Sequence, residues 1–173
     1  DQTSGKSTFV NLNNELTASA AEILLIGEFT VRGGEGKQTF VGDDSKQDLS
    51  LGSGDDIVFA GGGDDILSAS DGNNYFHGGA GNDEIAAGSG MDVFVGGAGD
   101  DIITVSSAGQ GDGDTIDGGS GTDTLSLSSG SHAFATDAKL QNINSITLAS
   151  TSTVIDLTGQ TESLTITGGA QAD

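Results

Sequence analysis

A nine-residue unit recurs over a little more than half of this chain, and it constrains the fold more than any other feature of the sequence. Residues 78–86 (GGAGNDEIA) show it in full, with glycine at positions one, two and four, aspartate at six and a large apolar residue at eight. A fixed short period predicts a repeat architecture and takes precedence over local secondary-structure propensity. In such a solenoid, each coil packs only against its neighbours.

Position eight keeps its phase through eight consecutive units, and the phase resumes after four extra residues, 105–108. The residues at position eight are Phe40, Leu49, Val58, Leu67, Phe76, Ile85, Phe94, Ile103, Ile116 and Leu125. Position six is occupied by Gln38, Gln47, Asp56, Asp65, Asn74, Asp83, Asp92, Asp101, Asp114 and Asp123. The first two units therefore keep the apolar residue but lack the acid.

The composition fits a solenoid better than a compact globule. Only 34% of the 173 residues are hydrophobic, below the usual ~45–50%, but each coil needs to bury only one thin stripe. Five Lys and Arg against a net charge of −21 disfavour nucleic-acid binding, because phosphates require neutralisation. The absence of cysteine excludes disulfides and thiolate metal sites. No apolar run approaches the ~20 residues of a membrane-spanning helix.

The chain divides into five segments. Residues 1–32 carry no repeat and are expected to contain a strand that caps the solenoid, because an open end exposes its core. Residues 33–126 form the repeat array, and residues 127–140 break the pattern and are predicted to form a loop. Residues 141–167 are expected to form metal-free β-solenoid coils. Residues 168–173 begin a further unit.

The prediction for residues 141–167 depends on apolar spacing alone. Ile146, Ile155 and Leu164 lie nine residues apart, as do Leu148, Leu157 and Ile166. Coils without a position-six acid would be held by apolar stacking. The alternative is three ordinary strands whose spacing is coincidental.

The turn of the repeat has the chemistry of a calcium site. Calcium binds six to eight oxygens, mixing carboxylates with backbone carbonyls. Glycines let the turn bend so that its carbonyls face a common centre, and the aspartate at position six adds charge. Because one turn supplies about half a coordination shell, a second turn must complete it. If two units make one coil, every second turn stacks on the same side at the ~4.8 Å strand spacing.

This arrangement predicts two columns of acids, one intact and one weakened at Asn74. The candidate carboxylate ligands are Asp56, Asp65, Asp83, Asp92, Asp101, Asp114 and Asp123. The candidate backbone positions are Gly61, Gly63, Gly79, Gly81, Gly88, Gly90, Gly97, Gly99, Gly119 and Gly121. We expect about five calcium ions, each bound by the turns of two successive coils.

The units GGAGNDEIA, GGAGDDIIT and GGSGTDTLS, with AGGGDDILS and LGSGDDIVF close behind, resemble the repeats-in-toxin (RTX) β-roll over roughly residues 33–126. The resemblance implies an all-β, right-handed parallel β-roll that binds calcium, in a secreted bacterial protein exported by a type I system. It further implies that the chain is unfolded in the low calcium of the cytoplasm and folds outside. The Ser- and Thr-rich tail resembles, more weakly, the flanks of RTX repeats in S-layer and giant surface proteins.

Three functions are compatible with these features. The chain is either a calcium-dependent structural segment of an S-layer or adhesin-like cell-surface protein, or the secretion and folding module of an enzyme or toxin whose active domain lies elsewhere. The third function is binding of a partner, by self-association or to a cell-surface polysaccharide. The two histidines form no His-Glu-x-x-His motif, and no Gly-x-Ser-x-Gly motif occurs, so an enzyme is not predicted.

Overall fold

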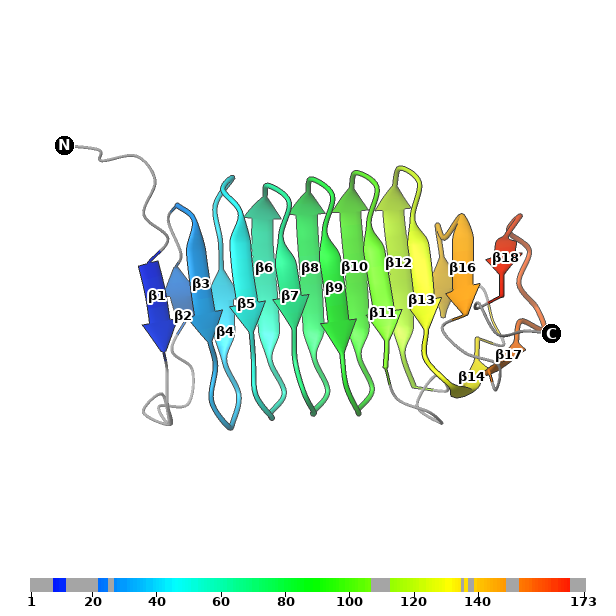
Figure 1. Ribbon diagram of the computed structural model, residues 1–173, viewed down its shortest axis with the longest axis horizontal. Helices are drawn as coiled ribbons and strands as arrows, with labels where there is room; N and C mark the ends of the chain where they lie inside the picture. The colour runs from blue at the N-terminus through cyan, green and yellow to red at the C-terminus, as the bar shows by residue number, and fades with distance from the viewer. Residues whose placement is uncertain are drawn as a thin grey trace.

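The computed structural model describes residues 8–11, 22–24, 27–106, 113–134, 136, 139–148 and 153–168. Within this part of the chain, every regular element is a β-strand. The chain winds into coils stacked along one axis, from β1 (Thr8–Asn11) at one end to β18 (Thr165–Thr167) at the other (Figure 1). The protein is therefore an all-β solenoid, as the repeat predicts.

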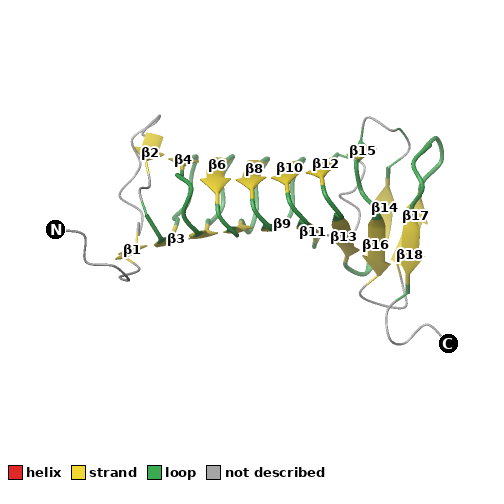
Figure 2. Cartoon of the chain, turned by 90° about the horizontal axis from the view of Figure 1, so that it is seen from above, coloured by secondary structure: helices red, strands yellow, loops and turns green. Residues whose placement is uncertain are grey.

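Two parallel sheets face each other along the axis (Figure 2). The nine-stranded sheet runs in the order β1, β3 (Phe29–Arg32), β5 (Gln47–Ser50), β7 (Ile66–Ser68), β9 (Glu84–Ala87), β11 (Ile102–Val105), β13 (Thr124–Leu127), β16 (Ser145–Leu148) and β18. The seven-stranded sheet runs in the order β15 (Leu140–Gln141), β12 (Thr115–Ser120), β10 (Val93–Ala98), β8 (Tyr75–Ala80), β6 (Ile57–Gly62), β4 (Thr39–Val41) and β2 (Glu22–Leu24). Since successive array strands alternate between sheets, two nine-residue units make one coil.

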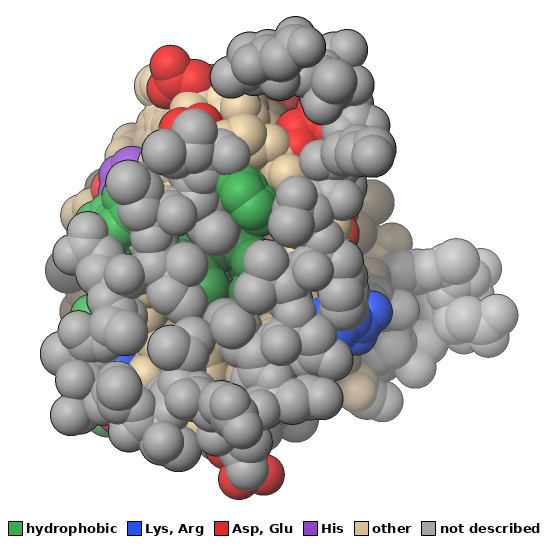
Figure 3. Space-filling model, turned by 90° about the vertical axis from the view of Figure 1, so that its left-hand side faces the viewer, with side chains coloured by type: hydrophobic (Ala, Val, Ile, Leu, Met, Phe, Trp, Pro, Cys, Tyr) green, Lys and Arg blue, Asp and Glu red, His purple; other side chains and the backbone are tan. Residues whose placement is uncertain are grey.

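The position-eight residues form the core between the sheets. Phe76 lies opposite Val58 on one side and Phe94 on the other, so like residues stack from coil to coil. All ten position-eight residues are at most 1% exposed. A fully buried side chain of this size contributes about 1.5–3 kcal/mol. Seen from the end at which β1 lies, apolar side chains are visible near the middle of the molecule (Figure 3).

The interruption of the repeat leaves the strand register intact. Val105, which the sequence assigns to the four extra residues, instead pairs with Ala87 and Leu127 as a regular part of β11. The extra residues therefore follow Val105, in a connection that includes 107–112 and lies outside the described residues. The register of the strands is therefore the same before and after the insertion.

The tail extends the roll but does not follow the nine-residue period. Ile146 pairs with Leu125 and with Ile166, twenty residues further along, so Leu164 does not stack on Ile146 as its spacing predicts. Ile155 lies opposite His132 in a separate two-stranded sheet. The predicted parallel pairing is confirmed for β16 and β18, whereas the single nine-spaced column is wrong because the chain leaves the seven-stranded sheet here.

That two-stranded sheet consists of β14 (Gly130–Ala133) and β17 (Thr153–Asp156). Strand β14 and the beginning of β15 lie within residues 127–140, where the sequence predicts a loop. Phe134 follows β14 and is completely buried, and its N–H donates to the Asp156 carbonyl. The strand forms because it pairs with β17. The local sequence does not indicate this pairing, which is why the prediction of a loop is wrong here.

Candidate metal centre

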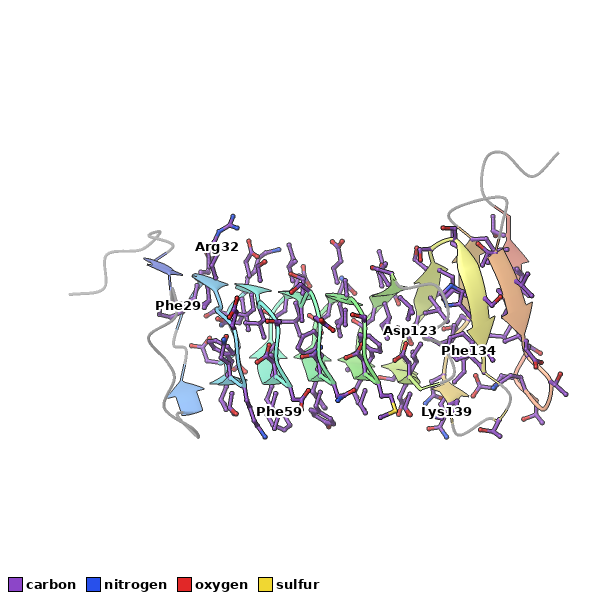
Figure 4. The ribbon with its side chains drawn as sticks, turned by 90° about the horizontal axis from the view of Figure 1, so that it is seen from below. Phe29, Arg32, Phe59, Asp123, Phe134 and Lys139 are labelled. Carbon is purple, nitrogen blue, oxygen red and sulfur yellow. The ribbon has the colours of Figure 1, made fainter. Side chains whose placement is uncertain are left out.

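The side chains at position six line the two edges of the roll in two columns. At the edge where the chain enters the nine-stranded sheet they are Gln47, Asp65, Asp83, Asp101 and Asp123. At the other edge they are Gln38, Asp56, Asn74, Asp92 and Asp114. None is more than 5% exposed. In Figure 4, Asp123 lies between the sheets, whereas Arg32 and Phe59 point outward.

One oxygen of each acid joins its coil to the preceding one. The N–H of Asp65 donates to Oδ1 of Asp83 at 2.8 Å, and the N–H of Asp83 donates to Oδ1 of Asp101 at 2.8 Å. The same bond recurs through the whole first column at 2.6–2.9 Å and through the second at 2.8–3.1 Å. The expected columns therefore form as continuous ladders of hydrogen bonds.

The second oxygen of most of these acids has no donor. The buried Oδ2 atoms without a hydrogen-bond partner belong to Asp56, Asp65, Asp83, Asp101 and Asp123. A carboxylate oxygen removed from water without a partner is strongly unfavourable while it is charged. Five such atoms in two regular columns therefore require either protons or cations.

Burial shifts these acids toward the protonated form. Desolvation is the main cause at every one, and it outweighs the backbone hydrogen bond to Oδ1, which acts in the opposite direction. The pKa of Asp65 is raised to about 7, and the pKa values of Asp56, Asp101 and Asp114 are raised to about 6. The pKa values of Asp83, Asp92 and Asp123 are raised as well. Near neutral pH, a divalent cation would take the place of these protons.

The glycines of the repeat keep the space beside these oxygens free. A Cβ on Gly78 would lie 2.1 Å from Oδ2 of Asp83, and a Cβ on Gly96 would lie 2.3 Å from Oδ2 of Asp101. At Gly79, φ is +119° and a Cβ would lie 1.9 Å from the carbonyl oxygen of Gly61, one coil earlier. The turns thus stack so closely that side chains are excluded, and carboxylate and carbonyl oxygens remain together.

Carboxylates alone do not make up a coordination shell. Among the described residues, no three Asp, Glu or His side chains converge on one point. Calcium prefers a mixture of carboxylate and carbonyl oxygens, so an ion at these turns would take most of its ligands from the backbone. The predicted glycines at positions two and four lie in these turns, and all except Gly88 have positive φ.

A second ladder, on the outside of the turns, was not predicted. The N–H of Asn73 donates to Oδ1 of Asp55 at 2.8 Å, and the N–H of Met91 donates to Oδ1 of Asn73 at 2.8 Å. An equivalent ladder on the other edge joins Asp64, Asn82, Asp100 and Thr122. The recurrence of Asp and Asn at position five was the available signal. This ladder is exposed and runs opposite in direction to the inner one.

A comparison with known families identifies the repeat. The family described as RTX calcium-binding nonapeptide repeat (4 copies) matches residues 32–67, 41–76, 50–85, 86–106 and 108–131, which together exceed half of the chain. The chain belongs to this RTX family. No curated protein and no solved structure matches it.

RTX nonapeptide repeats bind calcium, so calcium is the cofactor of this chain. The unpaired Oδ2 atoms and the glycine-lined space beside them fit such an ion. The RTX β-roll is a structural calcium-binding fold rather than a catalytic one, and it is typical of type I-secreted extracellular proteins. In the described part of the chain, no helix could cross a membrane.

Proposed function

We propose that this RTX β-roll is a calcium-dependent structural segment of a secreted bacterial cell-surface protein, of the S-layer or adhesin kind, which folds on binding calcium after type I secretion. One observation carries the calcium dependence, namely the buried carboxylates whose Oδ2 atoms have no donor, four in the first column and Asp56 in the second. Folding the chain at neutral pH without a cation would bury these charges unpaired, which is prohibitively unfavourable.

The ions would lie between stacked turns and be shared by successive coils. The turns of Asp65, Asp83, Asp101 and Asp123 form three consecutive steps of the intact column. Calcium there supplies positive charge to Oδ2 while Oδ1 retains its backbone hydrogen bond. In the second column, Asn74 replaces one acid, so this column would hold fewer ions. A total of about five ions would neutralise the buried carboxylates of both columns.

Calcium binding and folding would then be a single process. The net charge of −21 makes the metal-free chain repel itself, and the acids come together only when the coils stack. Where a site is absent from the unfolded state, the free energy of metal binding becomes free energy of folding. Low calcium before export and higher calcium after it would therefore keep the chain unfolded inside the cell and order it outside.

Two features support a structural role at the cell surface. Strands β16 and β18 continue the nine-stranded sheet beyond Asp123, the last repeat acid. The tail that carries them is rich in Ser and Thr. A continuous parallel sheet of this length forms a stiff rod in which each coil supports the next. Self-association or a cell-surface polysaccharide remains the proposed partner.

Two measurements test this proposal. Circular dichroism of the purified chain should show little β signal in chelator and a full β spectrum in millimolar calcium, whereas a full spectrum in chelator would contradict the calcium dependence. In the producing bacterium, an antibody against the β-roll should label intact cells. Recovery of the protein only from the culture medium, joined to a catalytic or pore-forming domain, would favour the alternative of an enzyme- or toxin-linked module.

A further inference from the structure

We infer that the side-chain amides of Gln38 and Gln47 take the place of calcium in the first two turns, so that the coil of residues 29–50 forms without an ion. This inference rests on the proposed calcium dependence of the acidic turns and adds that the dependence stops at this coil. Both glutamines occupy position six of their units, and both are buried.

Gln38 supplies hydrogen-bond donors to its own turn through Nε2, while its uncharged Oε1 is buried without a donor. Its Nε2 donates to the carbonyl oxygens of Gly34, at 3.0 Å, and Gly36, at 3.2 Å. These are positions two and four of the unit, the same positions whose carbonyls are the candidate calcium ligands in the acidic units. One amide nitrogen therefore provides hydrogen-bond donors to oxygens that otherwise would face a cation.

Gln47 also donates to the position-four carbonyl of its own turn, and it bridges two coils, while its Oε1 is buried without a donor. Its Nε2 donates to the Ser45 carbonyl at 2.8 Å, to the Gly27 carbonyl at 3.0 Å and to Oδ1 of Asp43 at 3.3 Å. Ser45 occupies position four of its unit, and Gly27 lies eighteen residues earlier, one coil before it. The amide thus joins stacked turns in the way proposed for calcium.

Asp43, the acid that contacts Gln47 in this turn, is compensated by hydrogen bonds. Asp43 accepts the N–H of Gly27 at 2.7 Å and the N–H of Ser45 at 2.9 Å, in addition to the Gln47 amide. The pKa of Asp43 is lowered, chiefly by the bond from Gly27. The buried acids of the array have raised pKa values instead, so the turn that contains Gln47 has no corresponding need for a cation.

Asn74, the third amide at position six, makes the same kind of contact as Gln38 and Gln47. Its Nδ2 donates to the Gly72 carbonyl at 3.1 Å and to Oδ1 of Asp92 at 3.0 Å. In all three units with an amide at position six, the nitrogen therefore contacts the carbonyl two residues earlier, at position four. The residue type at position six consequently determines whether a turn takes an ion or supplies its own donor.

A coil that forms without calcium would provide a folded template on which the calcium-dependent coils of the array could stack. Its strands β3 and β5 pair directly, and Val31, Phe40 and Leu49 bury their side chains. The backbone N–H groups of the two glutamines donate to the first acids of the array, Gln38 to Oδ1 of Asp56 at 2.8 Å and Gln47 to Oδ1 of Asp65 at 2.6 Å. Calcium-dependent coils would then add from this end toward the C-terminus.

Hydrogen exchange with and without calcium tests the inference in the full chain. In chelator, the amides of residues 39–41 and 47–50 should exchange more slowly than those of the equivalent strands 57–59 and 66–68, by about tenfold or more. Gln47→Glu keeps the shape of the side chain but replaces the donor by a charged acceptor facing Ser45, Gly27 and Asp43. This variant should lose the protection in chelator and regain it in calcium, with one additional ion bound by calorimetry.

Ser50→Asp is the matched control, because it adds the same charge to the exposed side of β5, outside the turn. It should retain the protection in chelator and the wild-type number of ions. Equal exchange of the two segments in chelator, or Gln47→Glu behaving as the control does, would overturn the inference while calcium still ordered residues 57–125. If calcium failed to order residues 57–125 in the wild-type protein, the proposed function itself would be wrong.

Discussion

Asp83 and Asp101 are joined by a hydrogen bond that involves only one of the two oxygens of the Asp101 carboxylate. The N–H of Asp83 donates to Oδ1 of Asp101 at 2.8 Å, while Oδ2 of Asp101 is buried without a donor. The first oxygen sets the stacking register, and the second is left for a cation. This division explains why acids prevail at position six, since an amide there provides one oxygen and a donor but no charge.

Removal of one inner acid should weaken calcium binding far more than removal of an outer one. Asp83→Ala removes a buried carboxylate that joins two coils, whereas Asp55 is exposed and accepts only from Asn73, from its backbone N–H and its side-chain amide. We expect the calcium midpoint of folding to rise by about tenfold or more for Asp83→Ala and by less than about threefold for Asp55→Ala. Calcium titrations followed by circular dichroism measure both midpoints. Equal midpoints would contradict the assignment of position six to the metal.

Substitution at Gly97 should separate steric exclusion from backbone strain. An alanine there would place its Cβ 2.1 Å from the Gly79 carbonyl oxygen at a φ of +123°, whereas Gly36 has a φ of +96° and open space around it. Strain alone costs of order 1–3 kcal/mol. Gly97→Ala should therefore lower the free energy of unfolding in saturating calcium by at least about 1 kcal/mol more than Gly36→Ala. Equal losses in urea denaturation would show that close stacking of the turns is unimportant.

Acid should partly replace calcium. In the metal-free fold, the pKa of Asp65 is raised to about 7 and those of Asp56 and Asp101 to about 6, against an ordinary value of 3.8. Raised pKa values mean that the folded chain binds more protons than the unfolded chain, so its stability is greatest below pH ~4 and is lost as pH rises toward ~7. Circular dichroism in chelator should show more β signal at pH 4.5 than at pH 7.5, where the signal should be small.

The same protonation should oppose calcium binding. Protons and calcium compete for the same carboxylates, so the calcium midpoint should increase as pH is lowered from about 7 to about 5. A midpoint independent of pH over this range would mean that the buried acids are not the ligands. Sedimentation velocity at each pH distinguishes folding from association.

Much of this fold was predictable because every unit of the repeat shows the same pattern of glycine, polar and apolar positions. The position-eight residues and the two columns of position-six residues lie where the nine-residue phase places them, since the strand period and the turn length are the same in every unit. The pairing of β14 with β17 was not predictable, because it depends on contacts between segments without repeat. The same reason explains why Ile146 pairs with Ile166 and not with Leu164.

The roles of the individual oxygens were also beyond the sequence. An acid at position six indicates a ligand, but only the folded structure shows that a backbone N–H donates to Oδ1 and that Oδ2 of most of these acids has no donor. Gln38 and Gln47 illustrate the same limit, because in the sequence they were only missing acids. Their amide contacts with carbonyl oxygens depend on the folded turn.

The stability of the tail should depend on the burial of Ile146. This residue is completely buried opposite Leu125, whereas Ile166 in β18 is 51% exposed. Ile146→Ala should destabilise the folded chain by about 2–5 kcal/mol, and Ile166→Ala by about 0.5 kcal/mol or less. Thermal unfolding in calcium measures both. Similar effects of the two substitutions would show that β16 and β18 do not differ in packing.

Anomalous diffraction from crystals grown in calcium would locate the ions that we place between stacked acidic turns. We expect about five peaks, beside Oδ2 of the position-six aspartates, with the Asp65–Asp83, Asp83–Asp101 and Asp101–Asp123 steps all occupied and the Gln38 and Gln47 turns empty. Peaks at the two glutamine turns, with none beside Asp83, would contradict this placement.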